Sequence, residues 1–79
     1  MQPATPPWIL EARTEIGRRV RKARLAAELT QDKLAELAEI DRRTLQRTEA
    51  GQFDLKVSQL FRLARALHLP ARDLLPPNT

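Results

Sequence analysis

The sequence predicts an all-α fold, a compact domain of five short helices. Apolar residues recur at spacings of three and four along four stretches of the chain, which is the period of a helix that buries one side. No stretch alternates apolar and polar residues as a half-buried strand does. The expected connections are two to six residues long and no internal repeat is visible, so the 79 residues are expected to form one domain.

The first ten residues are expected to form a proline-rich arm before the helical domain. Residues 1–10 contain three of the six prolines and no charged residue, which predicts an extended or irregular backbone. The apolar run Trp8-Ile9-Leu10 in this arm is expected to pack onto the domain or across a dimer. The domain itself is expected to span residues 11–75, followed by a short tail at residues 76–79.

The first three helices are predicted by their periodicity and their end signals. The first is expected from about Glu11 to Ala27, with Ala12, Ile16, Val20 and Ala23 on its inner side. Thr30 is a plausible N-cap for a second helix of about two turns, whose inner side holds Leu34, Ala35, Leu37 and Ala38. Asp41 is expected to cap a third helix, Arg42 to Ala50, which Gly51 ends.

A fourth helix follows a loop at residues 52–56. Its apolar residues are Val57, Leu60, Phe61, Leu63, Ala64 and Leu67, and Pro70 ends or follows it. Residues 71–75 are expected to make one last helical turn before Pro76-Pro77, which completes the count of five helices.

The composition restricts the classes of function. The chain has no cysteine and one histidine, His68, which excludes a disulfide scaffold and a thiolate metal site. No apolar stretch is long enough to span a membrane and the N-terminus does not resemble a secretion signal, so a cytoplasmic location is expected. The acidic residues do not converge with a nucleophile or a glycine-rich loop, so neither enzymatic activity nor a cofactor is expected. The net charge of +4 favours a polyanionic partner.

The stretch from Thr30 to Gly51 has the outline of a helix-turn-helix, whose second helix can enter the major groove of DNA. At about 100° per residue, one side of the third helix carries the polar residues Arg42, Arg43, Gln46 and Arg47 together with Ala50. Thr44, Leu45 and Thr48 fall on the other side. Arginine suits a reading side because its planar fork can bond O6 and N7 of guanine together.

In motif order and spacing, the chain from Ile16 to Leu75 resembles the lambda-repressor-like family, which includes Cro and repressor proteins and the xenobiotic-response-element type regulators. The matching segments are Ile16-Gly17-Arg18-Arg19-Val20, Arg24, Leu29-Thr30-Gln31, Leu34-Ala35, Arg47, Glu49, Gly51, Leu63-Ala64-Arg65-Ala66-Leu67 and Asp73-Leu74-Leu75. They extend over about three-quarters of the chain.

The resemblance implies roles for individual residues. Arg42, Arg43, Gln46 and Arg47 fall on positions that reach bases. Gln31 matches a glutamine that grips a phosphate, and Thr30, Arg19 and Thr44 are further candidates for phosphate contacts. Arg24 and Glu49 match a partly buried ion pair between the first and third helices. The family usually has glycine just past three helix ends, where this chain has Glu28, Glu39 and His68, so positive φ angles are expected there.

Two functions from different classes are compatible with these patterns. The first is a sequence-specific DNA-binding regulator, a homodimeric repressor that reads an inverted repeat, with an interface from about Leu67 to Leu75 and the Trp8 arm as an addition. The second is a protein-interaction module, such as an antitoxin or a domain that docks on the transcription machinery, for which DNA binding is secondary. Arginines at the base-reading positions favour the first. The sequence does not distinguish a phage-type repressor from an antitoxin or a restriction-modification controller.

Overall fold

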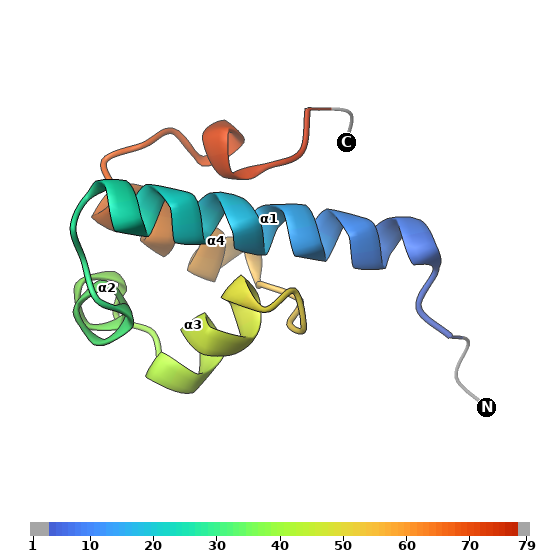
Figure 1. Ribbon diagram of the computed structural model, residues 1–79, viewed down its shortest axis with the longest axis horizontal. Helices are drawn as coiled ribbons and strands as arrows, with labels where there is room; N and C mark the ends of the chain where they lie inside the picture. The colour runs from blue at the N-terminus through green and yellow to red at the C-terminus, as the bar shows by residue number, and fades with distance from the viewer. Residues whose placement is uncertain (1–3, 78–79) are drawn as a thin grey trace.

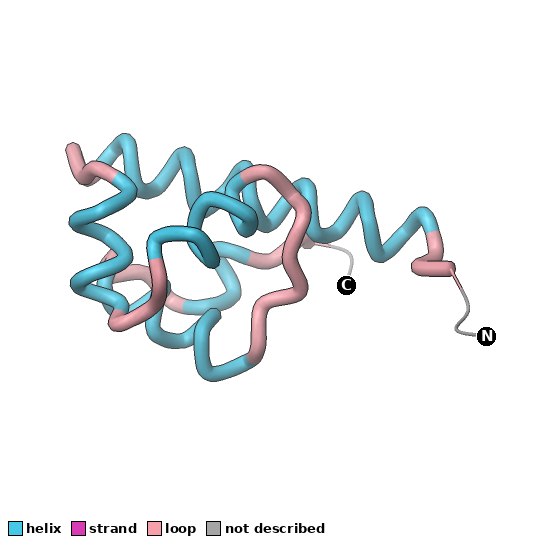
Figure 2. Tube along the Cα trace, turned by 90° about the horizontal axis from the view of Figure 1, so that it is seen from below, coloured by secondary structure: helices cyan, strands magenta, loops and turns pink. Residues whose placement is uncertain are grey.

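The computed structural model describes residues 4–77. It contains four α-helices, α1 (Pro7–Ala26), α2 (Gln31–Ala38), α3 (Arg42–Glu49) and α4 (Val57–Ala66), and one 3-10 helix, η1 (Ala71–Leu74). The described chain therefore has four α-helices rather than the five expected. The segment expected to be the fifth is a single 3-10 turn, because only five residues separate Pro70 from Pro76 and the last of them, Leu75, has the extended backbone favoured before proline. Figure 2 shows helices and loops but no strand in this part of the chain.

The first helix begins earlier than its charged residues suggest. Residues 7–10, expected to belong to an extended arm, form the first turn of α1, and the carbonyl of Pro6 accepts hydrogen bonds from the N–H groups of Ile9 and Leu10. Pro7 stands at the first helical position, where a missing N–H costs nothing and the fixed φ suits a helix. This N-terminal part of α1 projects beyond the rest of the domain (Figure 1). Residues 1–3 of the expected arm lie outside the described residues.

The helices pack around α1 and α4. In Figure 1, α2 and α3 lie on one side of α1 and η1 lies on its other side. α1 contacts α3 and η1, while α4 contacts α2 and η1. Each of the five elements contributes one fully buried aliphatic side chain to a common core, namely Val20, Leu34, Leu45, Leu63 and Leu74. Within this core, α3 packs against α1 and α2, which together set its position.

All four α-helices end in the same backbone motif. The residues at the turn, Glu28, Glu39, Gly51 and His68, have φ angles of 58°, 56°, 73° and 56°. In each case the N–H of the following residue bonds back to a carbonyl five residues earlier, as in a Schellman motif; for example, Gln52 N–H lies 2.8 Å from the oxygen of Arg47. The positive φ angles expected at the three non-glycine residues are thus confirmed.

Gly17 brings α1 against the backbone of α3. A Cβ atom at this position would overlap the carbonyl oxygen of Thr48 and lie 2.9 Å from that of Glu49. Only glycine permits this approach of the two helices, because both neighbours are main-chain atoms. Thr48 is buried at the same contact, and its hydroxyl donates to the Thr44 carbonyl at 2.8 Å. The last turn of α3 is therefore seated directly on α1.

Among residues 4–77, no helix is both long and apolar enough to cross a membrane.

Candidate nucleic-acid interface

The polar side of α3 is exposed. The four side chains expected to reach bases, Arg42, Arg43, Gln46 and Arg47, are all exposed, whereas Leu45 and Thr48 are buried against the core. Within the described residues, the side chains of Arg43 and Gln46 form no hydrogen bond or ion pair. Their donors and acceptors are therefore available to an external partner.

The two helix starts of the helix-turn-helix are capped differently. Thr30 caps α2 as expected, since its hydroxyl oxygen accepts from the N–H of Lys33 at 3.0 Å. Asp41 occupies the N-cap position of α3, but its carboxylate accepts from the Thr44 hydroxyl at 2.9 Å instead of from a backbone N–H. The expected side-chain cap at Asp41 is wrong in this respect, because the nearby hydroxyl competes for the carboxylate. Both threonine hydroxyls are thus engaged within the domain.

A buried ion pair joins α1 to α3. The Arg24 Nε and Nη2 atoms donate to the two carboxylate oxygens of Glu49 at 2.8 and 2.9 Å, and the side chains are only 10% and 4% exposed. Arg24 Nη1 also donates to the Leu29 carbonyl at 2.9 Å. The hydrogen bonds to Glu49 raise the pKa of Arg24 above its usual value. The pair expected from the resemblance is present, and its paired geometry is the strong form of this interaction.

Gln31 lies beside this ion pair. It is the first residue of α2, and its side-chain amide donates to Glu49 Oε1 at 3.2 Å. One carboxylate therefore connects residues of α1, α2 and α3. The carbonyl oxygen and second N–H of the Gln31 amide are not used in this bond, so the contact orients the side chain without exhausting it.

The arginines at the two ends of α3 have different partners. Arg42 Nε lies 3.1 Å from a carboxylate oxygen of Asp32 in α2, and both side chains are exposed. Arg47 folds toward the loop after α3, where its Nη2 lies 3.4 Å from the Gln52 carbonyl and its guanidinium carbon lies 5.4 Å from the centre of the Phe53 ring. Phe53 was not among the residues expected at the site. The only signal in the sequence is an aromatic residue two positions after the glycine that ends the helix.

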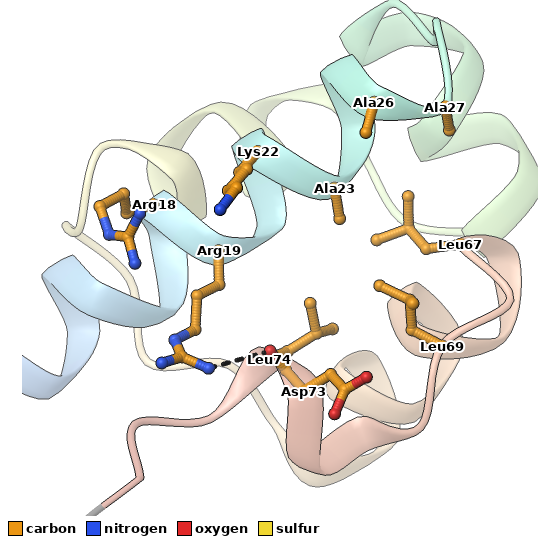
Figure 3. A pocket seen from close by; sticks show the side chains of 10 residues that line it. All are labelled: Arg18, Arg19, Lys22, Ala23, Ala26, Ala27, Leu67, Leu69, Asp73 and Leu74. Carbon is orange, nitrogen blue, oxygen red and sulfur yellow. Dashed lines mark hydrogen bonds between the residues drawn. The ribbon is translucent and has the colours of Figure 1, made fainter.

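The structure does not bring Arg19 to this surface. Arg19 donates to Glu15 at 2.7 Å and to the carbonyl of Asp73 in η1 at 3.2 Å, so its side chain faces η1 (Figure 3). It lines a cavity of about 640 Å³ with Arg18, Lys22 and apolar residues of α1 and the C-terminal segment. Hydrogen bonds from Arg18 and Arg19 lower the pKa of Glu15 to about 2. Because η1 and α3 lie on opposite sides of α1 (Figure 1), Arg19 is separated from Gln31, Thr30 and Thr44.

The comparisons with known proteins agree with this architecture. A helix-turn-helix family model, HTH_3, matches residues 20–74, and no curated protein sequence matches the chain. The restriction-modification controller protein C.AhdI from Aeromonas hydrophila is 33% identical, with 80% of this chain and 96% of that chain covered and a TM-score of 0.78. A hypothetical transcription factor, NHTF from Neisseria, is 26% identical over 99% of this chain and 90% of that chain, with a TM-score of 0.81.

A more distant structure shows the fold alone. An HTH_3 family transcriptional regulator from Vibrio cholerae is 18% identical, with a TM-score of 0.80, and the match covers 84% of this chain but 37% of that longer one. The family model spans most of the present chain, including every residue of α2, α3 and α4. This protein therefore belongs to the HTH_3 family of helix-turn-helix proteins.

Proposed function

We propose that the protein is a sequence-specific DNA-binding transcriptional regulator that inserts α3 into the major groove. The observation that carries this proposal is the exposed row Arg42, Arg43, Gln46 and Arg47 on a helix whose opposite side is buried. The Arg24–Glu49 pair holds that helix on α1, so the row is presented by a rigid support. Each bidentate contact of such an arginine with guanine is worth about 1–3 kcal/mol of discrimination.

The start of α2 is proposed to contact the DNA backbone. Gln31 stands at that helix end, and its amide is oriented by Glu49 at 3.2 Å. Thr30 and Thr44 lie at the N-terminal ends of α2 and α3, where helix N–H groups favour a phosphate. Arg19 is left out of this contact surface, because its partners are Glu15 and the Asp73 carbonyl.

We further propose a homodimer that represses from an inverted repeat. One short reading helix covers few base pairs, and a two-fold axis doubles the site, with half-sites about 34 Å apart. Within the expected interface from Leu67 to Leu75, Leu67 and Leu74 are buried in the core of the monomer. The apolar side chains that remain exposed on α4 are Val57 and Phe61, so this exposed apolar patch of α4 is the better candidate surface. The likeness to a restriction-modification controller protein favours that type of regulator.

The proposal is tested by selecting binding sites from a random pool of DNA duplexes with the full chain. We expect one inverted repeat to be enriched and bound by two copies of the chain. The Arg42, Arg43 and Arg47 alanine variants should then lose selectivity for it. If no sequence is enriched and these variants bind DNA as the parent does, DNA reading is refuted and the protein-interaction module takes its place.

A further inference from the structure

Phe53 meets Arg47 at the point where the chain leaves α3. The guanidinium carbon of Arg47 lies over the ring, 5.4 Å from its centre, a distance within the range of a cation–π interaction. A hydrogen bond from Arg47 Nη2 to the Gln52 carbonyl, 3.4 Å long, holds the same side chain from a second direction. The most C-terminal of the exposed arginines on α3 therefore has two uncharged partners, both in the loop that follows the helix.

The Phe53 ring is itself held in place. Phe53 is half-buried and lines an apolar cavity of about 240 Å³ with Ile9 and Ile16 of α1 and Leu60 of α4. The backbone beside it is restrained, because Arg13 contacts the Gly51 carbonyl at 3.4 Å and the Asp54 carboxylate at 3.5 Å. The ring thus joins the body of the domain to a side chain on the proposed DNA surface.

This contact leaves the reading chemistry of arginine available. Among the described residues Arg47 has one hydrogen bond, from Nη2 to the Gln52 carbonyl, so its other N–H groups can bond O6 and N7 of guanine. Arg42 differs, because its Nε faces the Asp32 carboxylate, a charged acceptor that DNA would have to replace. An arginine held by a ring also loses less rotamer freedom when it binds a base, since part of its ordering is already complete.

From this geometry we infer that Phe53 is a positioning residue for Arg47 and thereby sets selectivity at the base pair that Arg47 contacts. The inference rests on the proposed function, in which Arg47 reads a base. Phe53 touches no base in this arrangement and acts through the guanidinium alone. Its effect is therefore confined to one position of each half-site.

The first experiment measures the stacking without DNA. Ring currents should shift the side-chain proton resonances of Arg47 in the NMR spectrum of the full chain, and Phe53→Leu should remove the shift while keeping an apolar side chain in the cavity. Phe61→Leu is the matched control, because Phe61 is the other phenylalanine of the chain and is exposed on α4. Arg47 resonances that are the same in the parent and Phe53→Leu would overturn the inference.

The second experiment measures selectivity on the operator found by selection. Phe53→Leu should weaken binding to the selected operator by about two- to fivefold per half-site. Binding to an operator with a substituted base pair at the position read by Arg47, and to random DNA, should be unchanged. Phe53→Trp should restore the selectivity. Leu60→Met, a conservative change in the cavity that also holds Phe53, should not alter it. In an Arg47→Ala background, Phe53→Leu should have no further effect on that base pair.

Three results would overturn the inference. If Phe53→Leu weakens operator binding as much in the Arg47→Ala background as in the parent, Phe53 acts through the fold and not through Arg47. The same conclusion follows if Phe53→Leu weakens binding to the operator and to random DNA by the same factor. A gain in selectivity would show that the ring withholds Arg47 from DNA. These results differ from failure of the proposed function, in which the parent itself selects no sequence and Arg47 has no base to read.

Discussion

Glu49 accepts two hydrogen bonds from Arg24, at 2.8 and 2.9 Å, which tie the last turn of α3 to the last turn of α1. The same carboxylate accepts from Gln31 at the start of α2. A group that satisfies three donors in a nearly buried position stabilises the relative placement of three helices. Loss of its charge should be felt in the stability of the whole domain.

Glu49→Gln is expected to destabilise the protein, because it leaves the Arg24 charge buried without its counter-ion. Breaking a fully buried pair in this way lowers the free energy of unfolding by about 3–5 kcal/mol. Because this pair is slightly exposed, the expected decrease in the free energy of unfolding lies at or below that range. Thermal unfolding measures it. Replacing both residues, as Arg24→Met with Glu49→Met, is the control and should cost less than Glu49→Gln alone. An unchanged melting temperature for Glu49→Gln would contradict a structural role for the pair.

Gly17→Ala is expected to destabilise the domain although alanine favours helices. The added methyl group would overlap the Thr48 carbonyl oxygen, and a backbone atom cannot turn aside as a side chain can. Overpacking of this kind costs about 1–3 kcal/mol, which exceeds the gain of about 1 kcal/mol in helix propensity. Denaturant unfolding measures the balance. A more stable Gly17→Ala variant would show that α1 does not approach α3 this closely.

Glu28→Gly is expected to stabilise the protein by up to about 1 kcal/mol, because glycine relieves the strain of a left-handed residue. The greater freedom of glycine in the unfolded chain offsets part of this gain. Glu28→Ala is the matched control, since it removes the charge but keeps the Cβ atom. If both variants have the same melting temperature, the charge of Glu28 and not its backbone angle determines the effect.

The Glu15 carboxylate should stabilise the fold only above acidic pH. Its pKa falls from 4.5 to about 2 in the folded protein because Arg18 and Arg19 donate hydrogen bonds to the ionised form. A lowered folded-state pKa gives stability that is present above 4.5 and lost as the pH falls toward 2. The melting temperatures of the parent and Glu15→Gln should therefore converge over this interval. A difference that is constant with pH would contradict the assignment.

Arg43→Ala and Arg19→Gln should have different effects in DNA titrations, because the two arginines lie on different sides of the molecule. Arg43 is exposed on α3, so its loss should cost about 1–3 kcal/mol per half-site on the selected operator and little on random DNA. Arg19 faces η1, so its replacement should leave both the affinity and the salt dependence unchanged. A salt slope lowered by about one unit in Arg19→Gln would instead show that Arg19 contacts a phosphate.

Much of the fold could be predicted from the sequence because its signals are local. The spacing of apolar residues predicted most of the buried side chains, although Leu37, expected on the inner side of α2, is 50% exposed. Thr30 marked the start of α2 with a cap that depends on residues three positions apart. The family pattern placed left-handed turns at Glu28, Glu39 and His68, and the structure confirms them. The pairing of Arg24 with Glu49 came from the resemblance, since periodicity alone does not connect residues so distant in the chain.

The tertiary structure decided which side chains meet across helices. It alone turned Arg19 toward Asp73 in η1, placed Phe53 under Arg47, and pressed Gly17 against Thr48. The physical reason is common to all three. Local sequence fixes the direction of a side chain around its own helix axis. The partner that the side chain reaches depends on how the five elements pack around one core, and that packing is a property of the whole chain.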